Sequence, residues 1–564
     1  MFDIRKKLEA AGETILREKF GESTTIHFDV SMDEGRGDLT TSAALQVAKK
    51  LGKSPRDIAT TLADAFGKLP GVLSTEVAGA GFVNVTVAPA ELTKGFSAVR
   101  TACLPSKKRK EQPVIVEYSQ PNIAKPLGVH HILSTIIGQS LANMYRHLGY
   151  ETISINHIGD WGTQFGKLAV AHATWGTKPI ENHTIDDLLE LYVRFHTEAE
   201  KNALLEDEGR AAFKKLEDGD KELRVFWSAV VKITMGSMEK MYERLHVTFD
   251  HTQGESFYED KMAPILEEGK KKGVFKLGEE GAFIAEFPEE TKMPPAIALK
   301  GDGSTIYLTR DLAAANYRIN TWHPQAILYV VDVAQQLYFK QLFAVLGQLG
   351  WELPTLEHVI FGRMRFADKA MSTRKGNILR LEEVLDEAVK RADLLIAERG
   401  EKIQTDDPKG LAEMMGVGSV VYGVLSQNRK MDMVFDWDKM LTFEGNSAPY
   451  VQYTHARARS VLRKAGSLVS VSDIQELTAK ERTLIKLILM FGETVESARA
   501  DHLPHKLTNY LYELCQAFNS FYNSDEILTA PDETRNFRLS LTKLTADVLK
   551  TGAELLTLQV PDRM

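Results

Sequence analysis

The chain has 564 residues, which corresponds to about three or four domains of roughly 150 residues each. Its 43% hydrophobic and 26% charged residues are ordinary for a globular protein and exclude a disordered chain, a collagen and a disulfide scaffold. The formal charge of −8 argues against a surface covered with nucleic-acid-binding charge, although it leaves room for a local basic groove.

Three further features bear on location. No apolar run approaches the ~20 residues that a membrane span needs, so we expect no membrane association. The N-terminal segment mixes charges into a helical pattern, unlike a secretory signal. Two cysteines cannot supply a disulfide framework or a four-ligand zinc site, so we expect a cytoplasmic protein without a resident metal.

Residues 1–105 predict a small α+β domain. Apolar residues at helical spacing, helix-start signals and an alternating apolar pattern locate its elements. Helices are expected at 4–20, at 43–51 and from Pro55 onward, and a strand at 82–87 after a tight turn at 79–81. Residues 106–113 are polar and end in proline, so they predict a linker and a domain boundary.

The pattern changes at residue 114. A short apolar run at 114–118 is typical of a buried parallel strand, and a loop, a helical stretch at 130–148 and another strand at 150–155 follow it. This order predicts a βαβ unit in a doubly wound sheet. Further strands are expected at 326–331 and 358–361, a hairpin with an Asp-Gly turn at 300–308, and a helical insertion at about 170–270.

The C-terminal part, 406–564, is almost entirely helical in pattern and predicts a bundle. Its helices are expected at 418–425, 450–465, 478–498, 506–522 and 534–558. The predicted fold class is therefore α/β: a doubly wound, parallel-sheet (Rossmann-like) catalytic domain at 114–405, with the N-terminal α+β domain and a C-terminal all-α helical bundle.

The loop after the first sheet strand is the most informative stretch. It lies at the carboxyl end of a strand and opens a helix, which is where doubly wound sheets bind ligands. A helix N-terminus attracts phosphate through its free N–H groups and its dipole. Lys125, His130 and His131 add donors and positive charge at this point. The residues themselves thus favour a phosphate-binding site.

This stretch, SQPNIAKPLGVHH at 119–131 followed by STIIG at 134–138, resembles class I aminoacyl-tRNA synthetases, and more narrowly the arginyl-tRNA synthetase family. Further motifs of that family occur in the same order: HIGDWGTQFG at 157–166, YLTRD at 307–311, FDWD at 435–438, FEGN at 443–446 and YVQYTHAR at 450–457. The resemblance implies activation of L-arginine with ATP to arginyl-adenylate. The arginyl group then passes to the 3′-terminal ribose of tRNA(Arg), with release of AMP and pyrophosphate.

The resemblance also implies an ATP site with Mg²⁺ accompanying the nucleotide. Its residues are Gly128, His130 and His131 of the first signature, and Met371 and Ser372 of the second, FADKAMSTRKGN at 366–377. Fixed cations stabilise the charge that grows on the leaving pyrophosphate. Lys125, His130, His131, Arg374 and Lys375 are therefore the candidate catalytic residues. The first signature departs from the usual His-x-Gly-His, because Gly128 replaces its first histidine and His130 its glycine.

The amino-acid substrate implied here carries a guanidinium group, which is costly to bury unless it is paired, and carboxylates meet its fork. By resemblance, Tyr307 and Asp311 hold the guanidinium. These two residues share one face if their segment is helical. Glu117, Asn122 and Gln335 are expected to complete the arginine-binding pocket.

Aromatic and basic residues interleave in the predicted bundle. Single-stranded RNA is bound by stacking bases on aromatic and arginine faces, although aromatic stripes in bundles are also common core. The resemblance identifies this region as the anticodon-binding bundle and the N-terminal unit as a domain that contacts the tRNA elbow. The candidate tRNA-binding residues are Phe82, Asn84, Tyr453 and Arg457. We expect a monomer.

Two other functions stay open. The altered signature at 128–131 fits a catalytically impaired tRNA-binding paralogue. The fold also fits another enzyme of its kind, such as a class I synthetase for a different amino acid. A neutral amino acid would not need the Glu117 and Asp311 pair.

Overall fold

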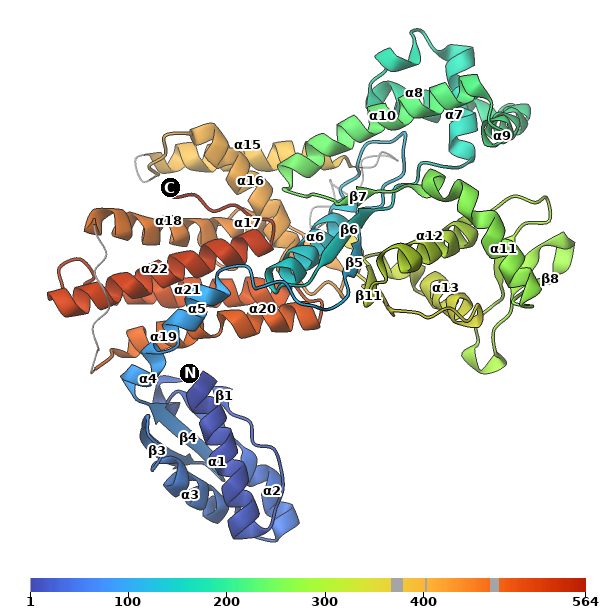
Figure 1. Ribbon diagram of the computed structural model, residues 1–564. Helices are drawn as coiled ribbons and strands as arrows, with labels where there is room; N and C mark the ends of the chain where they lie inside the picture. The colour runs from blue at the N-terminus through green and yellow to red at the C-terminus, as the bar shows by residue number, and fades with distance from the viewer. Residues whose placement is uncertain (1, 367–378, 401–402, 467–475) are drawn as a thin grey trace.

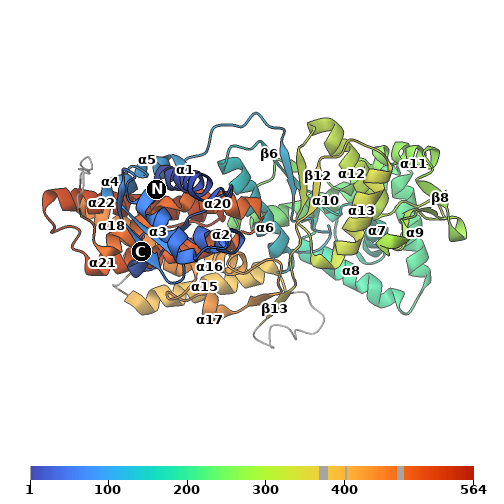
Figure 2. The same cartoon turned by 90° about the horizontal axis from the view of Figure 1, so that it is seen from below.

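The computed structural model describes residues 2–366, 379–400, 403–466 and 476–564. It has an N-terminal domain, a central parallel-sheet domain with a helical insertion, and a C-terminal helical bundle (Figure 1). Figure 2 shows the N-terminal domain and the bundle at one end of the molecule and the insertion at the other. In the part of the chain that the structure describes, no helix has the length and the apolar run that a bilayer crossing needs.

The N-terminal domain is α+β, as its sequence predicts. Its helices are α1 (Phe2–Phe20), α2 (Ala43–Leu51) and α3 (Pro55–Phe66). Its antiparallel sheet has the order β1-β2-β4-β3, with β1 (Asp29–Val30), β2 (Leu39–Thr41), β3 (Val72–Ala78) and β4 (Phe82–Val87). Positive φ angles at Gly79 and Gly81 form the tight turn between β3 and β4.

A buried carboxylate attaches this domain to the bundle. Asp38 is fully buried, accepts a hydrogen bond from the Val87 backbone N–H, and pairs with Arg482 of α19 (Ala479–Leu489). Lys486 of the same helix lies 3.8 Å from Asp38. Two short helices, α4 (Pro89–Thr93) and α5 (Phe96–Ala102), lead from the domain along the bundle (Figure 1).

The central sheet is parallel, with the strand order β12-β11-β5-β6-β7. Its strands are β5 (Val114–Glu117), β6 (Thr152–Asn156), β7 (His251–Thr252), β11 (Ala326–Tyr329) and β12 (Thr355–His358). The order reverses between β5 and β11, where a doubly wound sheet opens a crevice at its carboxyl edge. Glu117 and Tyr329 are register partners at that edge.

The residues of β5 pack alternately on the two faces of the sheet. Val114 and Val116 share a core with α6 (His131–His147), whereas Ile115 packs with α12 (Tyr307–Trp322) and α13 (Gln336–Gln348). The β5–α6–β6 unit confirms the predicted strand, helix and strand.

One sequence prediction in this domain is wrong, and a second is confirmed only in part. The strand expected at 358–361 lies earlier, since β12 ends at His358. The hairpin expected at 300–308 has its turn, in which the Gly303 N–H donates to the Lys300 carbonyl, and an antiparallel bridge between Leu299 and Thr305. Its second strand does not continue, because Tyr307 begins α12. Its Leu308, Leu312 and Ala315 recur at helical spacing and are buried against the sheet, so burial of that face favours the helix.

The insertion is largely helical, as expected. It contains α7 (Thr163–Trp175), α8 (Ile185–Ala199), α9 (Leu204–Glu217) and α10 (Lys221–Arg244). The expected range of about 170–270 is too long, because β7 within it is an edge strand of the central sheet. Beyond β7 come α11 (Met262–Lys271) and a small antiparallel sheet of β8 (Phe275–Leu277), β9 (Phe283–Ala285) and β10 (Ala296–Leu299).

Two paired strands and two helices join the sheet domain to the bundle. The strands are β13 (Met364–Phe366) and β14 (Met433–Phe435), and the helices are α15 (Leu381–Arg399) and α16 (Pro408–Leu425). The short helix α17 (Trp437–Met440) follows β14.

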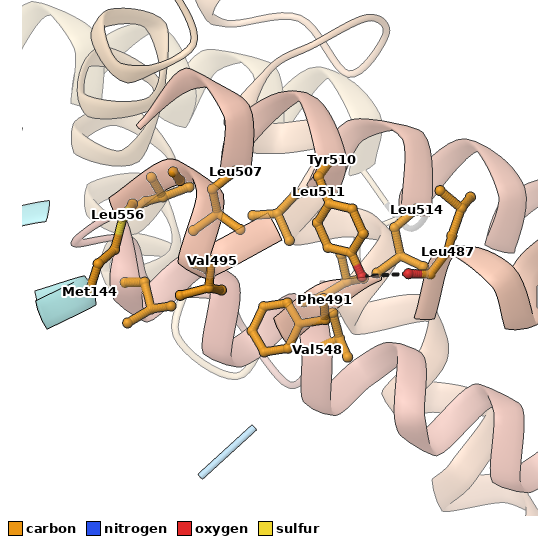
Figure 3. Packing of buried hydrophobic residues seen from close by; sticks show 14 of the residues in the cluster. Met144, Leu487, Phe491, Val495, Leu507, Tyr510, Leu511, Leu514, Val548 and Leu556 are labelled. Carbon is orange, nitrogen blue, oxygen red and sulfur yellow. Dashed lines mark hydrogen bonds between the residues drawn. The ribbon is translucent and has the colours of Figure 1, made fainter. Parts of the chain in front are cut away.

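The bundle comprises α18 (Ala448–Ala465), α19, α20 (Phe491–Ala500), α21 (His505–Ser524) and α22 (Asp532–Leu555). The single helix expected at 478–498 is two helices, because α19 ends before Met490 and a turn there directs Phe491 into the core. Figure 3 shows this core, in which the Tyr510 hydroxyl donates to the Leu487 carbonyl and Met144 of α6 lies beside Leu556. The bundle and the sheet domain thus share one apolar core.

Replacing Gly138 with alanine should destabilise the fold and displace α6. A Cβ at Gly138 would lie 2.2 Å from the Tyr118 Cβ at the end of β5. Overpacking of this kind costs about 1–3 kcal/mol of unfolding free energy. Gly236→Ala is the matched control, since a Cβ there meets nothing within 4 Å and should add about 0.5–1 kcal/mol of helix stability. Urea unfolding of both variants checks the prediction, which is contradicted if G138A is as stable as G236A.

Candidate functional site

The candidate site lies at the carboxyl ends of β5 and β11, where the strand order reverses. The loop from β5 to α6 has left-handed φ angles at three non-glycine residues, Ser119 (75°), Gln120 (54°) and Ala124 (66°). Such angles persist only where the surroundings enforce them. Each amide N–H donates to a side chain of another element: Ser119 to Ser134 Oγ, Gln120 to Asn156 Oδ1 and Ala124 to Thr234 Oγ1, at 3.0, 3.2 and 3.1 Å. Ser134, Asn156 and Thr234 belong to three other elements, and no sequence motif marks them as supports of this loop.

His131 begins α6, and its ring is fixed by the loop. His131 Nδ1 lies 3.0 Å from the Gly128 backbone nitrogen and 3.2 Å from the Gly128 carbonyl oxygen. Burial and the neighbouring His130 lower the pKa of His131 to about 4. The imidazole is therefore neutral at pH 7. The exposed His130 ring lies 4.1 Å from that of His131.

The segment that precedes α6 is paired with residues 379–381. The Val129 N–H donates to the Leu379 carbonyl and the Leu381 N–H to the Leu127 carbonyl, both at 2.8 Å, with Gly128 opposite Arg380. The four candidates of the second signature, Met371, Ser372, Arg374 and Lys375, lie outside the described residues. The described residues that follow them thus lie against the start of α6.

Glu117 already has partners within the chain. Its carboxylate is 4% exposed and pairs with Arg318, which is 1% exposed. Its Oε1 accepts a hydrogen bond from Gln120 Nε2 at 2.6 Å. Arg318 lies on α12, and no motif of the sequence analysis identified it. The expected pocket of two free carboxylates therefore contains one that is neutralised by an internal guanidinium.

Asp311 lies on the same helix, one turn after Tyr307. It accepts a hydrogen bond from the Tyr338 hydroxyl, and its Oδ1 lies 3.7 Å from His157 Nε2. Burial raises the pKa of Asp311, and the nearby Glu117 raises it further. Its side chain keeps 27% exposure, against 6% for Glu117, so Asp311 is the more accessible carboxylate. Tyr307 is 66% exposed at the start of α12.

The remaining pocket candidates lie on loops at the same edge. Asn122 is exposed and pairs through its backbone with Gly159, in the loop after β6. Gln335 is exposed at the end of a short 3₁₀ turn that follows β11. Lys125 lies on the β5–α6 loop, with its Nζ 4.5 Å from the centre of the Tyr192 ring.

The candidate RNA-binding residues lie elsewhere, on the bundle and the N-terminal domain. The Arg457 guanidinium lies 4.7 Å from the centre of the Tyr453 ring and 5.0 Å from that of Tyr522. All three line a groove of about 1050 Å³ that also contains Arg463, Lys464 and Arg563. Phe82 is 43% exposed, whereas Asn84 is 5% exposed and its amide oxygen accepts from Thr40 Oγ1.

Comparison with protein families agrees with this geometry. The sequence model described as tRNA synthetases class I (R), catalytic domain, matches residues 97–437. The model of the arginyl tRNA synthetase N terminal domain matches 3–87, and that of the DALR anticodon binding domain matches 451–564. The fold is thus that of a class I aminoacyl-tRNA synthetase. Within that class, the chain belongs to the arginyl-tRNA synthetase family.

Individual relatives support this membership. The chain is 39% identical over 548 residues to an arginine–tRNA ligase of Fusobacterium nucleatum, covering 96% of each chain, and 43% identical over 455 residues to one of Clostridium beijerinckii, covering 80% of each. The Thermus thermophilus arginyl-tRNA synthetase structure is similar with a TM-score of 0.79 at 25% identity, covering 99% of this chain and 100% of that one. The Plasmodium falciparum structure (TM-score 0.80, 24% identity, 100% and 99% covered) supports the fold.

Breaking the buried ion pair from one side should destabilise the protein. Arg318→Met leaves Glu117 as an uncompensated buried charge, which costs about 3–5 kcal/mol. The double variant E117Q/R318M removes both charges and should recover most of that loss. Thermal denaturation of the two variants checks the prediction, and equal destabilisation of both would contradict it.

Proposed function

We propose that the chain activates L-arginine with ATP to form arginyl-adenylate and then transfers the arginyl group to the 3′-terminal ribose of tRNA(Arg). The observation that carries this proposal is that the neutral His131 begins the helix after β5, while the accessible carboxylate of Asp311 lies 3.7 Å from His157, directly after the neighbouring strand β6. The helix start suits a triphosphate and the carboxylate suits a cation.

In the first step a carboxylate oxygen of arginine attacks the α-phosphorus of ATP, and the bond to pyrophosphate breaks. The free N–H groups at the start of α6 donate to phosphate oxygens, and the neutral His131 ring lies at the same helix start. Lys125, His130, Arg374 and Lys375 balance the charge of the leaving group in this proposal. Mg²⁺ enters with ATP as its counter-ion. In the second step a ribose hydroxyl of tRNA attacks the activated carbonyl, and AMP leaves.

Asp311 is the principal anion for the substrate guanidinium in this proposal, with Tyr307 beside it. Arg318 already neutralises Glu117, so Glu117 contributes hydrogen-bond acceptors rather than a free negative charge. Asn122 and Gln335 bind the amino-acid end. The pocket therefore keeps one negative charge, that of Asp311, for the single positive charge of the substrate guanidinium.

The tRNA contacts are assigned to the two ends of the chain. The groove with Tyr453 and Arg457 suits unstacked bases through its aromatic and arginine faces. Four basic side chains line it together with three carboxylates, those of Asp406, Asp525 and Glu526. Phe82 offers an exposed ring on the N-terminal domain, and Asn84 keeps only its amide N–H groups for a ligand, because its oxygen is engaged. That the protein is a monomer stays a prediction, which analytical sedimentation tests. Its cytoplasmic location also stays a prediction.

Pyrophosphate exchange with arginine, ATP and tRNA tests the proposed function. Exchange that depends on arginine supports it. An absence of exchange together with tight tRNA binding would instead indicate a tRNA-binding paralogue. Exchange that depends on another amino acid would indicate a synthetase for that amino acid. The variant G128H/H130G, which restores the usual first signature, then shows whether the altered order affects activity.

Replacing Asp311 with asparagine should raise the arginine KM about 100-fold, while the ATP KM stays within about twofold. Removal of one partner from a buried charge pair costs about 2–5 kcal/mol. Asp302→Asn is the matched control, because Asp302 accepts only from Ser304 of its own exposed turn. Exchange kinetics at varied arginine check this, and an unchanged arginine KM in D311N would remove Asp311 from the pocket.

A further inference from the structure

The nucleotide loop, defined as residues 119–128, is packed into the core of the helical insertion. Ile123 and Ala124 are 1% and 2% exposed and share an apolar core with side chains of α7, α8, α9 and α10. The Ala124 N–H donates to Thr234 of α10. Displacement of the insertion helices would therefore displace the backbone that carries Lys125.

The side chain of Lys125 is held by an aromatic ring. Its Nζ lies 4.5 Å from the centre of the Tyr192 ring on α8. Among the described residues, no carboxylate oxygen lies within 4.0 Å of this ammonium group. A salt bridge would neutralise the charge and compete with a phosphate for its N–H donors. A ring face restrains the group and leaves its positive charge available.

Tyr192 is itself placed by its neighbours on α8. Its ring meets that of His196, one turn later, at 4.6 Å between centres. Burial and the nearby Lys167 lower the pKa of His196, so that its imidazole is neutral at pH 7 and does not compete with Lys125 for the ring. The Tyr192 ring thus has Lys125 as its cation.

The first turn of α8 reaches the other side of the nucleotide loop. Asp186 Oδ1 accepts from Arg380 Nη1 at 2.5 Å, and Arg380 pairs through its backbone with Gly128. A capping box between Thr184 and Asp187 fixes the start of α8 beside this contact. Because Asp186 is largely exposed, this ion pair is the weaker of the two contacts.

We propose that α8 positions the phosphate-binding groups of the nucleotide loop, with Tyr192 and Asp186 as positioning residues. Tyr192 holds Lys125 over the loop without neutralising it, and Asp186 holds the strand pairing between Gly128 and Arg380 in register. The inference rests on the proposed function, because Lys125 is taken to bind the triphosphate. It assigns the insertion a part in ATP binding.

Loss of the Tyr192 ring should weaken ATP binding selectively. In pyrophosphate exchange by the full chain with tRNA, Y192L is expected to raise the ATP KM about 3- to 10-fold and to leave the arginine KM unchanged. Y192F keeps the ring and should restore the wild-type value. W175L is the matched control, since Trp175 stacks on Arg194 at 4.8 Å in the same insertion, apart from Lys125.

A double variant separates positioning from general damage. If Tyr192 acts through Lys125, then Y192L adds nothing in a K125A background, and D186N raises the ATP KM less than Y192L does. E198Q, which breaks the exposed pair between Glu198 near the end of α8 and Lys201 just after it, controls for D186N. An equal effect of Y192L and W175L, or a full effect of Y192L without Lys125, overturns the proposal.

Calorimetric titration with Mg-ATP keeps the two proposals distinguishable. If the Y192L variant exchanges pyrophosphate with the wild-type ATP KM, the positioning role is refuted and the proposed function stands. If the wild-type chain shows no exchange, the proposed function is refuted. In that second case, a 3- to 10-fold weaker Mg-ATP Kd of Y192L still supports the positioning role, and an unchanged Kd refutes it.

Discussion

The buried ion pair between Glu117 and Arg318 is the contact on which the site depends. It joins the end of β5 to α12 at the point where the strand order reverses. Asp311 precedes Arg318 by two turns on α12, so the same pairing helps to set the position of Asp311 beside His157, directly after β6. Burial of Arg318 without a carboxylate partner would be strongly unfavourable. Arg318 must therefore meet Glu117 at the end of β5, and this pairing fixes how α12 lies against the sheet.

Much of the fold could be predicted because its signals are local. Helix and strand periodicity, the Gly79 to Gly81 turn and the strand–loop–helix order are all encoded within short windows, and the structure confirms them. The short segment at 305–308 predicts a strand, but α12 begins within it at Tyr307. Four residues are too few to distinguish the period of a strand from that of a helix. Only burial of Leu308 and Leu312 against the sheet distinguishes the two.

The site was only partly accessible to sequence reasoning. The motifs brought Glu117 and Asp311 to attention, but they indicated two free carboxylates. Arg318, the partner that changes the charge of the pocket, is distant from Glu117 in the chain and belongs to no motif. The left-handed backbone of the nucleotide loop was likewise hidden, because Ser134, Asn156 and Thr234 support it from three other elements.

The same long-range contacts join the two ends of the molecule. The Tyr145 hydroxyl of α6 donates to His502 between α20 and α21, and His502 donates to Glu357 of β12, both at 2.8 Å. Met144, the preceding residue, lies in the bundle core (Figure 3). The helix that starts at His131 is therefore anchored in the bundle that carries Tyr453 and Arg457. Since packed cores do not deform continuously, a shift of the bundle must either move α6 with it or break this buried network.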